Sequence, residues 1–345
     1  MKIFVSIFIV ILIILAVYFS YVLFWPLSSL QDQSQSVTIK IRLGTSFNKI
    51  VTILLDSNVI CHEKEFIFTA KLFRKTNQLK AGKYQFYKNT SNYNVLSILS
   101  EGKFAAERVT IPEGVDARRI ASILQRIVEI DSITFINLVH DSTTIHEYNI
   151  NAHSLEGYLY PDTYQFPWGM SERQILHSMI AEFNKQVPDS LHSRAHEMGF
   201  SFNEILTLAS IIEGEAVLDD ERNIISAVYH NRLRRGMRLQ ADPTIQYLIA
   251  DSPRRLLNRD LEIDSPYNTY LYAGLPPGPI SNPGIKSIYA ALYPADVPYL
   301  YFVARGDGGH VFSTTLAQHN RAKVEFDKIR KQVARESKIK HNAKS

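Results

Sequence analysis

The hydrophobic pattern begins with one long apolar segment near the N-terminus. From Ile3 to Phe24 the chain carries no charged residue and consists mainly of Ile, Leu, Val, Phe and Ala. At about 1.5 Å per residue, a helix of this length crosses the ~30 Å hydrocarbon layer of a bilayer. A cleaved signal peptide has an apolar core of only about 7–15 residues followed by small residues, whereas bulky side chains follow here. The pattern therefore predicts an uncleaved membrane anchor within residues 1–27.

The charges around this segment predict its orientation. Lys2 precedes it, and the next charged residue, Asp32, comes well after it. Because positive charge is retained on the cytoplasmic side, we expect the N-terminus in the cytoplasm and the rest of the chain outside it. Residues 28–36 are polar and predict a short linker. The expected location is thus the cytoplasmic (inner) membrane, with a single span and extracytoplasmic domains.

After the linker, strand-like and helix-like patterns alternate, which predicts an α+β fold. Residues 37–41 alternate apolar and polar positions, and Ser46 is a candidate N-cap for a helix that carries apolar residues on one face. The same strand–turn–helix plan recurs after residues 83–87 and 108–111. The candidate turn residues are Gly44, Asn89 and Gly114.

Composition adds limits on the number of domains and on the partners. The chain has 345 residues, of which 46% are hydrophobic, and a net charge of +4, so two domains fit beyond the anchor. We expect a small α+β module over 37–105, a larger mixed α+β domain over 106–330 and a solvated basic tail over 331–345. No basic patch interleaves with stacking aromatics, so nucleic acid is not an expected partner. The only cysteine is Cys61, which excludes an internal disulfide.

A candidate catalytic group stands at the end of an apolar helix. Residues 205–212 are apolar on nearly every face, which predicts a buried helix with Asn203 as its cap. Gly214 is favoured just past a helix end, so Glu213 is expected in or near the last turn. The apolar neighbours and the negative end of the helix dipole both favour a protonated carboxyl group, and such a group is a general acid for a glycosidic oxygen.

Two interpretations of Glu213 remain open from the residues alone. It could be a catalytic acid, or a structural glutamate paired with an arginine such as Arg222 or Arg232. Glu215 cannot act from the same helical face, because residues two apart point about 200° from each other. One working carboxylate is therefore the simpler reading.

Two further segments carry polar and aromatic side chains suited to a sugar ligand. Tyrosine rings offer flat apolar faces with a hydroxyl at one end, and Pro/Gly loops hold polar groups in fixed positions. Ordinary turns and loops also have this composition without binding a ligand. The candidate substrate-binding residues are Glu156, Tyr158, Tyr160, Asp162, Tyr164, Arg232, Gln240, Asp242, Thr244, Tyr267, Asn268, Tyr270 and Asn282.

Five motifs, taken in order, resemble the YceG-like family of endolytic murein transglycosylases. They are Glu-Gly-Tyr-Leu-Tyr-Pro-Asp-Thr-Tyr at 156–164, Ala-Ser-Ile-Ile-Glu at 209–213, Arg-Leu-Gln-Ala-Asp-Pro-Thr at 238–244, Tyr-Asn-Thr-Tyr at 267–270 and Gly-Leu-Pro-Pro-Gly-Pro-Ile at 274–280. The resemblance implies that Glu213 is the catalytic residue and that 106–330 is the catalytic domain. Residues 37–103 also resemble, weakly, the LysM family of peptidoglycan-binding modules.

The family resemblance further implies a reaction and partners. Family members cleave the MurNAc–GlcNAc β-1,4 bond inside nascent peptidoglycan glycan strands, form a 1,6-anhydro-MurNAc end and so terminate glycan elongation beside peptidoglycan synthases. The sequence contains no HExxH motif, no Cys/His cluster and no Gly-rich phosphate loop, so it implies neither a metal nor another cofactor.

Two other functions stay open at this point. A muramidase would add water and needs a second carboxylate, for which Asp242 and Glu156 are candidates. A non-catalytic wall-binding or divisome scaffold would use the module at 37–105 to bind glycan.

Overall fold

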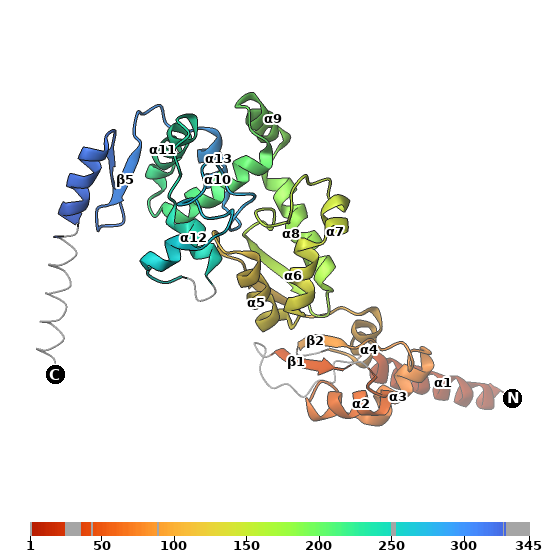
Figure 1. Cartoon of the computed structure of the whole chain (residues 1–345). Helices are drawn as coiled ribbons and strands as arrows, with labels where there is room; N and C mark the ends of the chain where they lie inside the picture. Colours follow the sequence, from red (N-terminus) through yellow and green to blue (C-terminus); the bar gives the residue numbers. More distant parts are fainter. Residues whose placement is uncertain are drawn as a thin grey trace, which may run out of the picture. The chain divides into compact units, whose positions relative to one another are not determined.

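The computed structural model describes residues 2–24, 36–42, 44–87, 90–249, 253–326 and 328. The chain forms two compact units, coloured along the sequence in Figure 1. Unit 1 comprises Met1–Arg108 with Gln165–Met170, and unit 2 comprises Val109–Tyr164 with Ser171–Ser345. Helices are combined with two-stranded sheets, which confirms the α+β class.

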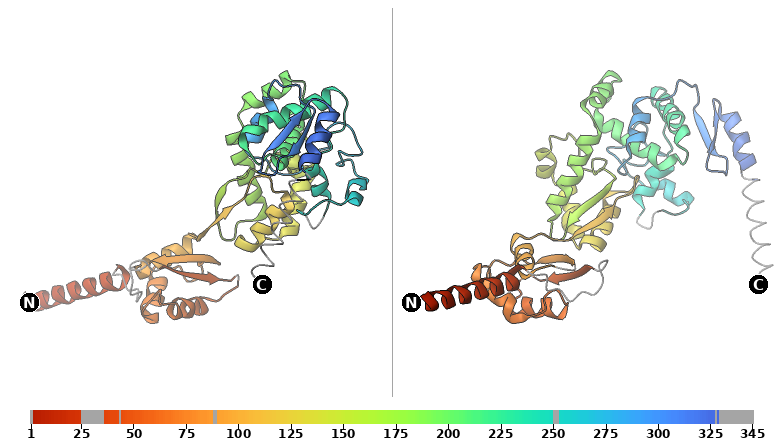
Figure 2. Two further views of the ribbon diagram at one scale, coloured as in Figure 1. Left: turned by 90° about the vertical axis from the view of Figure 1, so that its left-hand side faces the viewer. Right: turned by 180° about the vertical axis from the view of Figure 1, so that it is seen from behind.

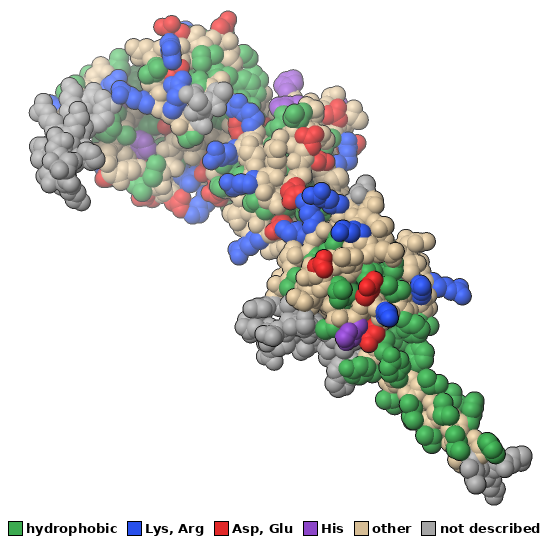
Figure 3. All heavy atoms as spheres, turned by 90° about the horizontal axis from the view of Figure 1, so that it is seen from below, with side chains coloured by type: hydrophobic (Ala, Val, Ile, Leu, Met, Phe, Trp, Pro, Cys, Tyr) green, Lys and Arg blue, Asp and Glu red, His purple; other side chains and the backbone are tan. Residues whose placement is uncertain are grey.

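Unit 1 begins with helix α1 (Lys2–Phe24). Its segment Ser6–Phe24 is long and apolar enough to cross a membrane. Apolar side chains cover the narrow rod formed by this helix in Figure 3. Near its C-terminal end α1 is fixed to the rest of unit 1, because the Asn92 side-chain amide donates a hydrogen bond of 3.1 Å to the Val22 carbonyl oxygen.

The remainder of unit 1 is a small module built around a two-stranded antiparallel sheet. Strand β1 (Ser36–Ile41) pairs with β2 (Gly82–Tyr87), and Ile39 lies opposite Tyr84. Helices α2 (Phe47–Asp56) and α3 (Glu63–Leu72) come between the strands, and α4 (Asn92–Glu101) follows β2. The expected cap at Ser46 is confirmed, since its hydroxyl accepts from the Lys49 backbone N–H. Gly44 and Gly114 adopt positive φ as turn residues do, whereas Asn89 lies outside the described residues.

The boundary between the units falls within a second sheet, formed by β3 (Ala106–Thr110) and β4 (Thr163–Pro167). Unit 2 is mainly helical, as Figure 2 shows from two sides. Its further elements are α5 (Ala117–Val128), α6 (Ser132–His140), α7 (Ser142–Glu147), α8 (Glu172–Gln186), α9 (Asp189–Glu197), α10 (Phe202–Glu215), η1 (Asp219–Glu221), α11 (Arg222–Arg234), α12 (Asp242–Leu248), η2 (Asn258–Glu262), α13 (Ile285–Leu292), β5 (Tyr301–Ala304) and β6 (His310–Ser313).

Helix α10 is the central helix of unit 2. Its residues 205–212 are all buried, and it packs against α11, α12 and α13. A helix that is apolar on every face must be covered on every face, and these three neighbours, with α9, provide the cover. The C-terminal end of α10, where the candidate glutamate stands, is thereby held rigidly.

Two details of α10 differ from expectation. Its N-cap is Ser201, whose hydroxyl accepts a hydrogen bond from the backbone N–H of Glu204. The Glu204 carboxylate in turn accepts a hydrogen bond from the backbone N–H of Ser201. The prediction of Asn203 was wrong because this capping box satisfies two backbone donors at once. Gly214 lies within the last turn rather than past it, since α10 extends to Glu215. A Cβ on Gly214 would lie 2.7 Å from the Pro243 ring, so this glycine permits close packing of α12.

Candidate active site

The side chain of Glu213 is held by two groups at the end of α10. Its Oε1 lies 3.2 Å from Nη1 of Arg222, and only 7% of the side chain is exposed. Its Oε2 accepts a hydrogen bond of 3.1 Å from the backbone N–H of Gly284, the N-cap residue of α13. A buried carboxylate needs such partners, because its charge is costly away from water.

The arginine partner of Glu213 is Arg222 and not Arg232. Arg222 begins α11, which follows α10 after only the short turn η1, and so its guanidinium returns to the end of α10. The same guanidinium bonds Asp219 at 3.0 Å and the Ser287 hydroxyl at 2.5 Å. Lys286 forms a second ion pair with Asp219. The ion pair considered from the sequence is therefore present, and it belongs to a larger charged network.

A turn after β3 is pinned against this network. Backbone hydrogen bonds of 2.9 Å from Gly114 N to Asn282 O and of 3.0 Å from Asn282 N to Val115 O join the turn to the segment before α13. Gly114 has a φ of +75°, and a Cβ there would lie 3.3 Å from Cγ of Glu213. The left-handed conformation favours glycine here, and the close approach to Glu213 leaves little room for a side chain.

The turn also brings a second carboxyl group to the site, that of Glu113. A Cβ on Gly284 would lie 2.0 Å from Oε1 of Glu113, so the carboxyl group occupies the space beside the Gly284 backbone. Burial raises the pKa of Glu113, and the charge of Glu213 raises it further, while Arg222 and Lys286 act in the opposite direction. Gly284 thus contacts Glu113 on one side and donates its N–H to Glu213.

Sequence reasoning missed Glu113. The available signal was a carboxylate directly before a glycine expected to turn the chain, in Pro112-Glu113-Gly114. That glycine was interpreted only as a turn residue, because nothing local indicates that the turn meets the end of a helix far along the chain.

The second glutamate of α10, Glu215, faces different neighbours. Its Oε1 accepts a hydrogen bond of 3.0 Å from the Tyr229 hydroxyl. Burial, and then the nearby charge of Asp242, raise its pKa to about 7. Asp242 in turn accepts a hydrogen bond from the Tyr270 hydroxyl. The divergence of Glu213 and Glu215 agrees with the angle between residues two apart on a helix.

Glu156 and Asn282 form a buried latch between two of the predicted motifs. Both carboxylate oxygens of Glu156 accept from the Ala117 backbone N–H at 3.1 Å, and the Asn282 amide donates to Oε1 at 2.6 Å. The Asn282 side-chain oxygen accepts from the backbone N–H groups of Gly157 and Leu159. Asn282 is also hydrogen-bonded to the turn at Gly114. The Glu156–Asn282 pair therefore helps to hold that turn in position beside Glu213.

The other predicted residues divide by exposure. Several are buried and hydrogen-bonded within the protein. Arg232 donates to the carbonyl oxygens of Leu300 and Leu239, and Asn268 donates to those of Leu261 and Ile263. Thr244 bonds Ala241 and Thr269, Tyr158 donates to Asn203, and Tyr164 donates to the carbonyl oxygen of Tyr160. These bonds hold the surrounding loops in place. The residues left with exposed or half-buried side chains are Asp162, Gln240, Asp242, Tyr267 and Tyr270.

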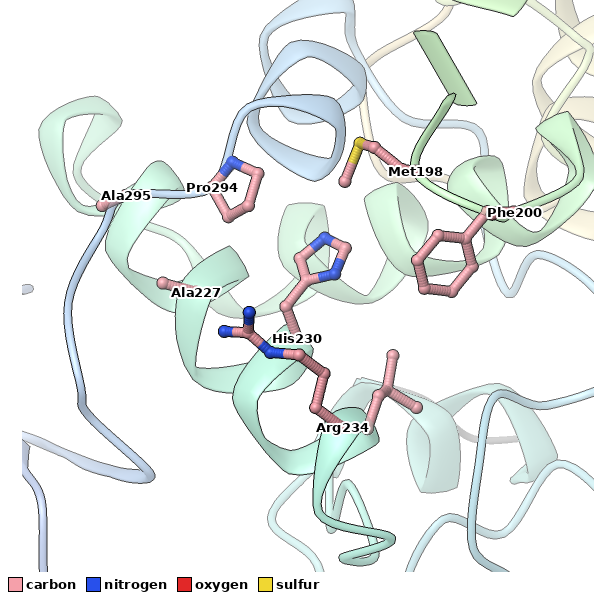
Figure 4. A pocket seen from close by; sticks show the side chains of 9 residues that line it. Met198, Phe200, Ala227, His230, Arg234, Pro294 and Ala295 are labelled. Carbon is pink, nitrogen blue, oxygen red and sulfur yellow. The ribbon is translucent and has the colours of Figure 1, made fainter. Parts of the chain in front are cut away.

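A separate pocket lies on another face of α11. It has a volume of about 500 Å³ and is lined by Met198, Gly199, Phe200, Ala227, His230, Leu233, Arg234, Pro294 and Ala295. Figure 4 shows the His230 imidazole with the labelled side chains of Met198, Phe200 and Pro294 around it. The His230 ring bonds the Ala291 carbonyl oxygen at 2.8 Å. The pocket lining contains no carboxyl group, so the acid–base chemistry of Glu213 is not repeated there.

Comparison with known proteins identifies the family to which this chain belongs. The model of the YceG-like family matches residues 39–325. The chain belongs to the YceG-like family. The match covers both the module of unit 1 and nearly all of unit 2, so the Glu213 site lies inside the family's shared region.

Relatives and a solved structure agree with this membership. The chain is 38% identical over 312 residues to the endolytic murein transglycosylase of Bacillus subtilis, covering 86% of each chain. It is 29% identical over 326 residues to the endolytic murein transglycosylase of Streptococcus pneumoniae, covering 85% of this chain but 59% of that protein. The crystal structure of a YceG-like protein from Listeria monocytogenes is 36% identical, with a TM-score of 0.59 over 83% of this chain and 99% of the other.

Proposed function

We propose that this protein is a peptidoglycan lytic transglycosylase that cuts glycan strands with Glu213 as its catalytic carboxyl group. The observation that carries the proposal is the position of Glu213, a carboxyl group fixed by Arg222 and the Gly284 N–H at the rigid end of α10. Relatives that share most of this chain are named endolytic murein transglycosylases. A fixed carboxyl group is the main chemical requirement of that reaction.

The reaction needs one proton donor and one proton acceptor. A proton passes to the glycosidic oxygen, and the bond from that oxygen to C1 of MurNAc breaks. The 6-hydroxyl of the same sugar then attacks C1, and its proton passes to a carboxylate. In the simplest scheme Glu213 acts first as acid and then as base, and no water or second nucleophile is consumed. The product is a 1,6-anhydro-MurNAc end.

We propose that the bond cut is the β-1,4 bond between MurNAc and GlcNAc inside nascent strands, so that cleavage ends their elongation beside the synthases. Sugar contacts are assigned to the exposed and half-buried members of the predicted set, which are Asp162, Gln240, Asp242, Tyr267 and Tyr270. Tyrosine rings and carboxylates match the apolar faces and hydroxyl edges of sugars.

The proposal includes a location. Helix α1 anchors the chain in the cytoplasmic membrane with its N-terminus inside, and the rest of the chain works on the outer side. The support is the apolar segment Ser6–Phe24 together with Lys2 before it. The module of unit 1 is proposed as a LysM-like glycan-binding module, supported by its β1–α2–α3–β2 order around one antiparallel pair.

The proposal is tested by digesting purified, uncrosslinked glycan strands with the full-length protein in detergent and analysing the ends by mass spectrometry. We expect internal cleavage with 1,6-anhydro-MurNAc ends, and a loss of at least 10²-fold in rate for Glu213→Gln, as for removal of a general acid or base. Glu197→Gln, an exposed position on α9, is the matched control. Reducing ends without anhydro products would indicate a muramidase, and an inactive wild-type protein would favour a wall-binding scaffold.

A further inference from the structure

The charged network around Glu213 contains more acidic than basic groups. Glu113, Glu213 and Asp219 face Arg222 and Lys286. Arg222 pairs with both Glu213 and Asp219, and Lys286 pairs with Asp219. In the part of the chain that the structure describes, Glu113 forms no ion pair. Among the three acids, Glu113 is therefore the one whose negative charge is least compensated.

The environments of Glu113 and Glu213 differ in the way that separates an acid from a base. Glu213 is nearly buried and held by a guanidinium and a backbone N–H, both of which stabilise a carboxylate. Glu113 instead places its carboxyl end against the Gly284 backbone without an ion-pair partner among the described residues, and burial, then the charge of Glu213, raise its pKa. Two carboxyl groups in contrasting environments commonly divide the acid and base roles of one reaction.

The geometry also allows Glu113 to meet a substrate. Glu113 as a whole residue is exposed, although its carboxyl end lies against the Gly284 backbone and is partly desolvated there, whereas the side chain of Glu213 is nearly buried. Tyr160, from the motif at 156–164, lies close enough for the charge of Glu113 to raise its tyrosyl pKa, after burial as the larger cause. Glu113 therefore lies near both the end of α10 and the motif at 156–164, whose exposed member Asp162 is a proposed sugar contact.

We propose that Glu113 is a second catalytic residue, which protonates the leaving glycosidic oxygen while Glu213 serves as the base for the 6-hydroxyl. This inference rests on the proposed function and deepens it. The proton of the Glu113 carboxyl group passes to the glycosidic oxygen as the C1–O bond breaks, and the electron pair of that bond stays on the oxygen. The 6-hydroxyl oxygen bonds to C1, and its proton passes to Glu213. One proton has then moved from Glu113 to Glu213, and exchange with solvent restores the starting state.

The experiment compares Glu113→Gln and Glu213→Gln, in the full-length protein, on two substrates. One is the natural glycan strand, and the other is a short strand of the same disaccharide units with 4-nitrophenol on C1 of its terminal MurNAc. Nitrophenolate leaves without a proton, so it needs no general acid. We expect Glu113→Gln to lose 10²–10⁴-fold in kcat on the natural strand but less than about 10-fold on the nitrophenyl substrate, where proton donation contributes little. Glu213→Gln should be impaired on both.

A second readout is the pH profile of kcat/KM on the natural strand. The groups facing Glu113 are Glu213 on α10, Asp219 on η1, Arg222 on α11, Lys286 on α13 and Tyr160. A general acid must be protonated to act, so activity should fall as pH rises through the ionisation of Glu113. The residual activity of Glu113→Gln should lack this alkaline fall, whereas the control Glu197→Gln should retain it.

Each outcome decides between the alternatives. Wild-type rates for Glu113→Gln on natural strands would overturn the inference while leaving the proposed function intact. Equal losses on both substrates would also overturn it, because they would indicate a role in position or folding rather than proton donation. A rescued rate on the nitrophenyl substrate by itself demonstrates that the variant is folded. If the wild-type protein forms no anhydro ends, the proposed function fails first.

Discussion

Glu156 is a buried carboxyl group with neutral hydrogen-bond partners, namely the Ala117 backbone N–H and the Asn282 amide. Burial raises its pKa to about 8, compared with an ordinary value of about 4.5. The folded state therefore binds the proton of Glu156 more tightly than the unfolded state does. The stabilisation from this group is complete below about pH 4.5 and is lost as pH rises through about 8.

This linkage predicts the effect of Glu156→Gln, which removes the ionisation and keeps the shape of the side chain. Between pH 5 and pH 8 the free energy of unfolding of the wild type should fall relative to that of the variant, by on the order of a few kcal/mol. Thermal unfolding at a series of pH values measures the difference. Parallel pH curves for the two proteins would contradict the prediction.

Gly284 contacts both carboxyl groups of the site, and Gly284→Ala tests that arrangement. The new methyl group would occupy the place of the Glu113 carboxyl end, which is flexible and can move away at little cost in stability. We expect a loss of about 10²-fold in kcat, as for small displacements of catalytic groups, with a nearly unchanged melting temperature. Glu197→Gln, at an exposed position on α9 outside the site, is the control. A fully active Gly284→Ala enzyme would show that this packing is not needed.

The two ends of helix α10 contribute to different properties of unit 2, one to its stability and the other to the proposed chemistry. The capping box of Ser201 and Glu204 fixes the N-terminal end, while the C-terminal end carries Glu213. Between them the helix is buried on every face, so it behaves as a rigid rod.

This separation predicts that Ser201→Ala destabilises the protein without altering catalysis. Loss of the N-cap should cost about 1 kcal/mol, which lowers the melting temperature by about 2–4 °C for a domain of this size. The rate well below the melting temperature should stay at the wild-type level. Ser193→Ala on α9 is the matched control, since Ser193 is exposed and its hydroxyl donates to the Asp189 carbonyl oxygen within the same helix. A large loss of activity in Ser201→Ala would contradict the independence of the two ends.

At the scale of the whole molecule, the proposed anchor makes a prediction about topology. Lys49 is exposed on α2, on the proposed outer side of the membrane. In a Cys61→Ser background, Lys49→Cys should react with a membrane-impermeant maleimide added to protoplasts, whose cytoplasmic membrane is intact. The protein should also remain in the membrane fraction after alkaline extraction. Labelling only after lysis would place the module on the inner side, and release by alkali would remove the anchor.

A feature could be predicted when the residues that determine it are close together in the sequence. The apolar segment of α1, the strand β1 and the Ser46 cap follow from neighbouring residues, and the structure confirms them. Asn203 was predicted as the cap because its residue type suits that position, but a serine suits it equally, and only the reciprocal bond with Glu204 shows that Ser201 is the cap. The choice of Arg222 over Arg232 depended on the short η1 turn, which returns α11 to the end of α10.

The sequence by itself determined a membrane-type apolar segment, an α+β chain and a glutamate at the end of a buried helix, because short-range periodicity and capping encode these features. The ordered motifs also indicated the family to which the chain belongs. Only the tertiary structure decided which groups surround that glutamate. Glu113 and Gly284 meet Glu213 through turns that come from distant parts of the chain, and the Glu156–Asn282 latch holds those turns together. Contacts of this kind depend on how loops from distant parts of the sequence pack together, and local sequence patterns do not predict that packing.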